Sequence, residues 1–173
     1  MIRKGTRDDL PQIEALFDEH FQYQKRHESY TISQRGIFPT IEGMSQAIDS
    51  GALFVCEEDG ENLGHIVLDK NPPPEFSNID WHIAAPEGSV AVIHMINVRP
   101  RVYRRGIARR FIEFAADWGR EQGCIVLRSE CGSQNLPAVL LFKHTGFERV
   151  GISSIKVNGV IQADGHIFFE KAL

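Results

Sequence analysis

Cysteine is scarce in this chain of 173 residues. Cys56, Cys124 and Cys131 form neither a CxxC pair nor an even-numbered framework. Disulfide scaffolds and structural zinc sites depend on such patterns, so the spacing disfavours both and predicts no metal site. A reducing compartment, the cytoplasm, is expected.

Long apolar runs and excess positive charge are also missing. No stretch approaches the roughly 18 apolar residues of a membrane span, and the first residues lack the apolar core of a signal peptide. Lys and Arg total 19 against 23 Asp and Glu, which gives a net charge of -4. A broadly basic surface is therefore absent, and the sequence predicts neither a membrane nor a nucleic acid as partner.

The length fits one domain over residues 1–173, because a chain of this size can bury a sufficient core without disulfides or metals. Apolar periodicity predicts a helix that follows a cap at Asp8, with Pro11 in its first turn, and further helices over 40–50, 107–122 and 135–144. Strands are predicted near Ile2 and over 52–57, 63–68, 89–98, 125–131, 149–157 and 166–170. The alternation indicates a mixed α/β sheet.

Turn signals refine this pattern. Glu58-Asp59-Gly60 predicts a hairpin between the strands at 52–57 and 63–68. The strand over 89–98 is apolar on both faces, which is typical of a central strand. The last two strands are joined either at Asn158-Gly159 or at Asp164-Gly165.

A basic segment connects the predicted central strand to the next helix. Six arginines are concentrated here: Arg99, Arg101, Arg104, Arg105, Arg109 and Arg110. Unpaired amides and the peptide dipole at a helix N-terminus favour bound anions. A small polyanion is therefore the expected ligand, with Arg104 and Arg105 best placed to meet it and Arg109 and Arg110 on a solvated helix face.

Two motifs resemble those of the GNAT acetyltransferase superfamily. The first is Tyr103-Arg104-Arg105-Gly106-Ile107-Ala108, which resembles the family's acyl-CoA pyrophosphate loop, although Tyr103 stands where Gln or Arg is usual. The second is Asn135-Leu136-Pro137-Ala138 followed by Leu141-Phe142-Lys143-His144-Thr145-Gly146-Phe147. Phe142 occupies the position of a tyrosine that often protonates the leaving thiolate in the family, and it has no proton to give.

The resemblance implies a mixed, mostly antiparallel central sheet of about six to seven strands with helices on both faces. It also implies acetyl-CoA as co-substrate, with no metal, and direct transfer of the acetyl group to a primary amine of a small molecule or peptide. The residues expected to bind the cofactor are Ile96, Val98, Tyr103, Arg104, Arg105, Gly106, Ile107, Ala108, Asn135 and Phe142. A homodimer is an expectation from the family alone.

Acetyl transfer needs a neutral amine, and only about a thousandth of a primary amine is neutral near pH 7. His94, on the predicted central strand, resembles the histidine base of some arylalkylamine acetyltransferases, and the usual pKa of histidine near 6.5 suits a base. The alternative is a hydrogen-bonded core histidine.

Glu130, on the neighbouring strand, is the alternative base, unless it is solvated or salt-bridged. Cys131 could in principle form an acyl-enzyme, but buried cysteine is common and no histidine partner is evident. Direct transfer is therefore preferred.

Segments that border the acceptor pocket in such folds contain Tyr23, His27, Glu28, Tyr30, Phe38, Asp80, Trp81 and His82.

Two other classes stay open. A non-catalytic acyl-CoA-binding sensor is suggested by Phe142 and Tyr103, which replace the motifs' most reactive side chains. A nucleotide-binding domain could use the same loop for ATP, but GxxxxGK[ST] and GxGxxG are absent.

Overall fold

The computed structural model describes residues 1–27, 30–157 and 159–173. Seven strands form one sheet in the order β1-β2-β3-β4-β5-β7-β6. The strands are β1 (Ile2–Lys4), β2 (Leu53–Glu58), β3 (Glu61–Asp69), β4 (Val90–Val98), β5 (Val126–Gly132), β6 (Glu148–Val157) and β7 (Ile161–Ala172). Every neighbouring pair is antiparallel except β4 and β5, which are parallel. The predicted mixed, mostly antiparallel sheet is confirmed, with β4 at its centre.

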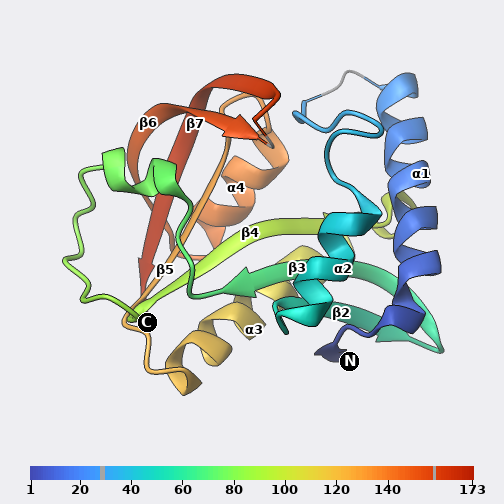
Figure 1. The fold of residues 1–173 in the computed structure, drawn as a ribbon, viewed down its shortest axis with the longest axis horizontal. Helices are drawn as coiled ribbons and strands as arrows, with labels where there is room; N and C mark the ends of the chain where they lie inside the picture. The colour runs from blue at the N-terminus through green and yellow to red at the C-terminus, as the bar shows by residue number, and fades with distance from the viewer. Residues whose placement is uncertain (28–29, 158) are drawn as a thin grey trace.

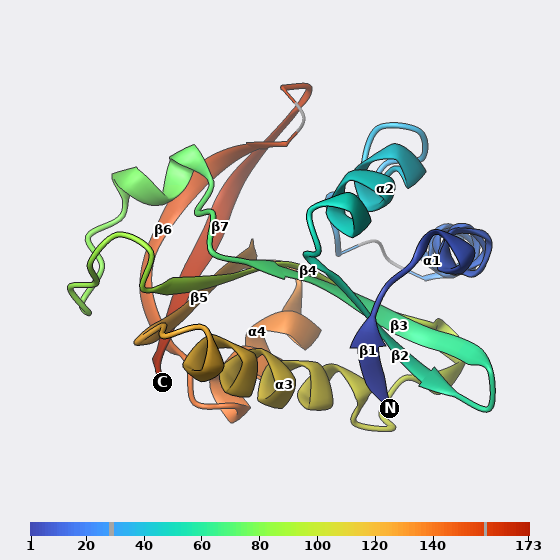
Figure 2. The ribbon, with the colours of Figure 1, turned by 60° about the horizontal axis from the view of Figure 1, so that its bottom comes forward.

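Helices cover both faces of the sheet, as expected (Figure 1, Figure 2). They are α1 (Leu10–Arg26), α2 (Ile41–Asp49), α3 (Ile107–Glu121) and α4 (Leu136–His144). One core joins α1 and α2 to the face that carries Val55, and another joins α3 and α4 to the opposite face. Figure 2 shows the two helix pairs on opposite sides of the strands.

Local signals explain most element ends. Asp59 and Gly60 both have positive φ angles, 51° and 78°, as a two-residue turn between β2 and β3 requires. The Asn135 side chain accepts from the Ala138 amide and caps α4. These turn and cap predictions are confirmed.

The start of the first helix differs from the prediction. Residues Arg7–Asp9 form a 3-10 turn, and α1 begins only at Leu10. Asp9, not Asp8, is the buried acid: its carboxylate accepts from the Thr6 amide and from Arg3. Asp9 occupies the N-cap position of α1, but its side chain makes no cap hydrogen bond there and pairs instead with Arg3 from β1.

The second proposed end turn is wrong, because Asp164 and Gly165 lie inside β7. The β6–β7 register shifts between Ser153 and Ile155, opposite this dipeptide. Gly165 has a φ of 69°, so the glycine serves a bulge rather than a turn. In the other proposed turn, Asn158 lies outside the described residues.

Candidate functional site

The sheet opens between β4 and β5. Their parallel pairing covers only Val90–Val92 with Val126–Arg128. Where it ends, the Ser129 hydroxyl donates to the Ile93 carbonyl at 2.9 Å. Beyond this bond lies a cavity of about 730 Å³ lined by both strands, by the 30–39 segment, and by α1, α3 and α4.

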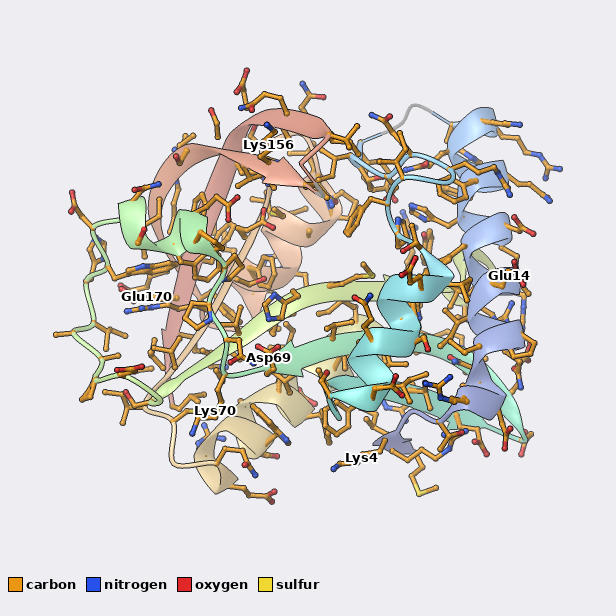
Figure 3. The ribbon with its side chains drawn as sticks, viewed as in Figure 1. Lys4, Glu14, Asp69, Lys70, Lys156 and Glu170 are labelled. Atoms are coloured by element: carbon orange, nitrogen blue, oxygen red, sulfur yellow. The ribbon has the colours of Figure 1, made fainter. Side chains whose placement is uncertain are left out.

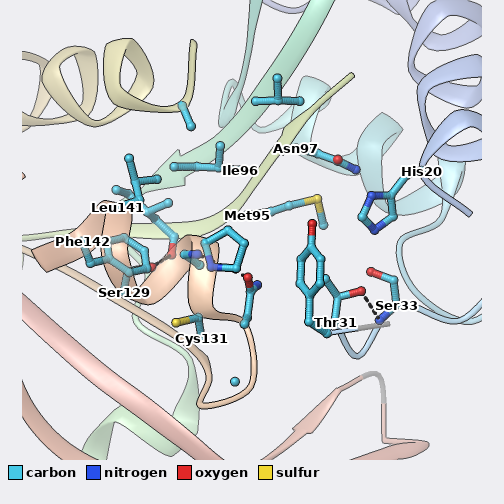
Figure 4. A pocket seen from close by; sticks show the side chains of 18 of the residues that line it. His20, Thr31, Ser33, Met95, Ile96, Asn97, Ser129, Cys131, Leu141 and Phe142 are labelled. Carbon is cyan, nitrogen blue, oxygen red and sulfur yellow. Dashed lines mark hydrogen bonds between the residues drawn. The ribbon is translucent and has the colours of Figure 1, made fainter. Parts of the chain in front are cut away.

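Figure 4 shows Ser129, Cys131, Leu141 and Phe142 on one side of this cavity and His20, Thr31 and Ser33 on the other. Ile96 and Val98 line it from β4. Their strand pairs with β3 on its far edge, where Ile66 lies opposite Ile96. Within the described ranges, no strand pairs with the near edge of β4 after Val92. An extended ligand arm can therefore lie along that edge.

The N-terminus of α3 lies at one end of the cavity. Arg104 and Gly106 have positive φ angles of 67° and 78°, and no side chain among the residues described caps the helix. In the part of the chain that the structure describes, the amides of Arg104, Gly106, Ile107 and Ala108 have no hydrogen-bond partner. The loop thus presents several free donors at a positive helix end, which suits an anion such as pyrophosphate.

The Arg105 amide, unlike its neighbours in the loop, has a partner, because it donates to the Val102 carbonyl. The Arg105 guanidinium pairs with Glu58, outside the cavity, and Arg110 pairs with the same carboxylate. Of the two arginines expected at the anion, only Arg104 lines the cavity, and it forms no ion pair with the other residues that the structure describes.

The other arginines of the segment also have acidic partners. Arg109 pairs with Glu113 on the exposed surface of α3, as expected, although it also lines the cavity. Arg99 is buried and pairs with Glu19 on α1, which makes it a structural residue.

Tyr103 faces α1 and the 30–39 segment. Its ring meets Tyr23 edge-on at 5.4 Å, and its hydroxyl interacts with Tyr30. Burial, together with the neighbouring tyrosines, raises the Tyr103 pKa well above the usual value, so the phenol stays protonated. Tyr103 forms part of the cavity wall and carries no charge toward an anion.

Asn135 and Phe142 line the cavity from the α4 side. The Asn135 side chain is already used as the α4 cap. Phe142 is 4% exposed and packs between Phe147 and Phe169, with ring centroids 4.9 Å and 5.0 Å away. Its role in the described structure is apolar packing at the cavity wall.

His94 lies at a bulge in β4. Val67 pairs with Met95 and Leu68 with Ile93, so His94 is the extra residue. Its Nε2 lies 2.7 Å from Oδ1 of Asp69, at the end of β3, which Figure 3 labels. Burial disfavours charge on Asp69, but hydrogen bonds from His94 and the Asn71 amide outweigh it and lower the Asp69 pKa. An ionised Asp69 accepts, so Nε2–H donates and Nδ1 keeps a free lone pair. His94 is therefore hydrogen-bonded, as the alternative of a core histidine predicts, and it also lines the cavity.

Glu130 lines the cavity from β5, and its Oε2 contacts Nδ1 of His166 on β7. The neighbouring Cys131 is buried, and this burial together with the charge of Glu130 raises the pKa of its thiol to about 12. A thiol with this pKa is a poor nucleophile at neutral pH, which argues against an acyl-enzyme.

Only some of the residues expected at the acceptor pocket line the cavity. Tyr23, Tyr30 and Phe38 line the cavity. His27 stacks on Tyr23, and Trp81 packs on Phe76 and Phe168 in another core. Neither lines the cavity, nor do Asp80 and His82. Glu28 lies outside the described residues.

Sequence reasoning missed three residues of the site. His20 and His166 line the cavity, and Asp69 contacts His94, which lines it. His94 meets Asp69 only through the β3–β4 bulge, and His166 meets Glu130 only through the β5–β7 register. Neither register is readable from a single sequence.

The described residues contain no group of three or more His, Cys, Asp or Glu side chains arranged to hold a metal ion. None of their helices has both the length and the apolar character needed to cross a membrane.

The sheet thus splits beside an uncapped helix N-terminus, and both border one cavity. The chain belongs to the acetyltransferase (GNAT) family, whose model matches residues 10–147. An uncharacterized N-acetyltransferase of Methanocaldococcus jannaschii is 29% identical over 148 residues, covering 85% of this chain. The chain spans 60% of the length of that relative.

Solved structures share the fold. A GNAT-family acetyltransferase of Streptococcus agalactiae has a TM-score of 0.78 at 17% identity, over 100% of this chain and 95% of that one. A structure from Salmonella typhimurium, determined with its cofactor acetyl-CoA, has a TM-score of 0.69 at 16% identity, over 100% and 93% of the two chains. At these identities, the similarity shows the fold alone.

Proposed function

We propose that this protein transfers the acetyl group of acetyl-CoA directly to a primary amine of a small molecule or peptide. The observation that carries the proposal is the continuity of one cavity: free amides at the start of α3 line one end, and His94, held by Asp69, lines the β4–β5 opening. The family and the acetyl-CoA found in a related fold support the choice of donor. A single catalytic domain in the cytoplasm fits three buried free cysteines, and a homodimer stays an expectation from the family.

The residues fit an acyl-CoA chemically. The amides of Arg104, Gly106, Ile107 and Ala108 would hold the pyrophosphate, with Arg104 supplying charge. The unpaired edge of β4 at Ile96 and Val98 would hydrogen-bond the amide-containing arm. Asn135 and Phe142 would flank that arm from α4. Acetyl-CoA supplies the acetyl group as a thioester, so that a C–N bond forms, a C–S bond breaks and CoA leaves as the thiol.

His94 is the proposed base. Its free Nδ1 accepts the proton that the amine loses, and Asp69 orients the ring and stabilises the resulting imidazolium. Glu130 remains the alternative base. Phe142 cannot protonate the departing thiolate, so water supplies that proton.

A non-catalytic acyl-CoA sensor is the second candidate, since Phe142 and Tyr103 replace two reactive positions of the motifs. Thiol release from acetyl-CoA with a panel of primary amines separates the two. Amine-dependent release supports the enzyme. Tight acetyl-CoA binding with no release across the panel supports the sensor and overturns the proposed activity.

A further inference from the structure

Two histidine–carboxylate pairs flank the opening of the sheet. Val92 and Arg128 are the last paired residues of β4 and β5. His94 and Glu130 follow two residues later, one on each strand, and both line the cavity. Asp69 is hydrogen-bonded to His94, and His166 contacts Glu130. The proposed reaction needs only one base, so the second pair is available for another task.

Glu130 offers an open carboxylate. Its side chain is 23% exposed, and it is the only acidic residue among those of the described chain that line the cavity. Oε2 contacts His166, whereas Oε1 has no hydrogen-bond partner among the residues described. The nearest arginine in sequence, Arg128, is already engaged by Glu170 and by the Ile83 carbonyl. No guanidinium or ammonium group of the described chain therefore neutralises Glu130.

His166 fixes this carboxylate without cancelling its charge. The His166 side chain is 4% exposed, and its Nε2 is buried with no partner in the described part of the chain. A proton on Nε2 would be a buried, unsatisfied donor, which carries a free-energy cost. The neutral ring with its proton on Nδ1 avoids that cost and donates to Glu130. The carboxylate keeps its full charge.

The cavity is consequently bipolar. Arg104 and the free amides of α3 line its anion-binding end, and Glu130 lies on β5 across the opening from His94. Around the rest of that opening the 30–39 segment contributes the uncharged Thr31 and Ser33 and a larger apolar or aromatic set: Tyr30, Ile32, Phe38 and Pro39. Nothing from this segment that lines the cavity is charged.

We infer that Glu130, oriented by His166, binds the ammonium group of the acceptor, and that the acceptor is a primary amine on an apolar or aromatic body without a carboxylate. This inference rests on the proposed acetyl transfer. Glu130 contacts the cation before His94 removes its proton, and His166 is a positioning residue. A carboxylate on the acceptor would lie near the negative charge of Glu130, with no cation beside Glu130 to offset the repulsion.

Calorimetry on a dead-end complex tests the inference without turnover. The protein is saturated with CoA, which carries no acetyl group, and titrated near pH 7 with 2-phenylethylamine, n-hexylamine or the neutral analogue 2-phenylethanol. Glu130→Gln should weaken binding of both amines by about tenfold or more, as expected for a lost hydrogen bond between charged groups, and leave 2-phenylethanol unchanged. Glu148→Gln, at an exposed carboxylate of β6 away from the cavity, is the matched control.

Two His166 variants separate positioning from folding. In His166→Asn the amide nitrogen takes the place of Nδ1, so amine binding should stay within about threefold of the wild type. In His166→Leu the loss of amine affinity should approach that of Glu130→Gln.

In steady state, Glu130→Gln should raise the KM of the amine far more than it lowers kcat. Equal amine affinity in Glu130→Gln and wild type overturns the inference, as does failure of both amines to bind. Either result can occur while thiol release still supports acetyl transfer, so the two proposals fail separately.

Discussion

Nε2 of His94 lies 2.7 Å from Oδ1 of Asp69, across a bulge that makes His94 the unmatched residue of β4. The bulge turns a strand residue into the cavity, and the carboxylate of the adjacent strand fixes the tautomer. A histidine held in this way can take a proton at its other nitrogen.

Replacement of His94 by Gln should lower kcat by about 100-fold or more, the usual contribution of a positioned base, with CoA affinity unchanged. Asp69→Asn should give a smaller loss, because the ring keeps a hydrogen-bond partner but loses the charge that stabilises imidazolium. Steady-state kinetics and a CoA titration check the assignment. An unchanged kcat in His94→Gln would remove His94 from the mechanism and favour Glu130.

Two glycines bracket α3 and form a matched pair. Gly106 precedes the helix with a φ of 78°, Gly123 follows it with a φ of 74°, and a Cβ on either would meet no atom within 4 Å. Alanine at each should therefore destabilise the fold similarly, by about 1–2 kcal/mol. Only Gly106→Ala should also weaken CoA binding, because it alters the amides of the loop. Equal CoA affinity in the two variants, measured by calorimetry, would place the anion site elsewhere.

His65 should make folding stability depend on pH. It is fully buried on β3, both its ring nitrogens lack partners in the described structure, and burial lowers its pKa to about 4. Between pH 4 and 6.5 the unfolded chain holds a proton that the folded one lacks, so stability falls as the pH falls through this window. The expected loss is about 3 kcal/mol.

Urea unfolding at several pH values tests this. His65→Leu should flatten the dependence, whereas His27→Leu, at the exposed end of α1, should not. The buried His20, whose pKa is also lowered by burial, leaves a residual slope. If the folding stability of His65→Leu depended on pH as steeply as that of the wild type, His65 would not be the source of the dependence.

Cys131 should not form a covalent acetyl intermediate during the reaction. With a pKa of about 12, its thiol is almost wholly protonated at neutral pH. Acetyl-CoA without amine should give no burst of thiol, and Cys131→Ala should keep kcat within about threefold of the wild type, because only packing is lost. Acetylated Cys131 in a mass spectrum of the quenched reaction would contradict direct transfer.

The elements that the sequence predicted well carry strong local signals. The Asp59-Gly60 turn, the Asn135 cap and the apolar stripe of α3 each depend on residues close together in the chain. Loop 103–108 could be located for the same reason, since helix starts are local.

The pairs at the site could not be predicted in this way. Asp69 lies 25 residues from His94, and His166 lies 36 residues from Glu130. A bulge or a one-residue slip in register changes which side chains meet. The partners of Arg105 and Arg110 also depend on where the β2–β3 turn places Glu58.

A crystal structure with acetyl-CoA tests the central claim most directly. The account predicts pyrophosphate oxygens within hydrogen-bond distance of the amides of Ile107 and Ala108, and the thioester in the opening between β4 and β5, near His94. Acetyl-CoA bound outside this cavity, or no binding at millimolar concentration, would contradict it.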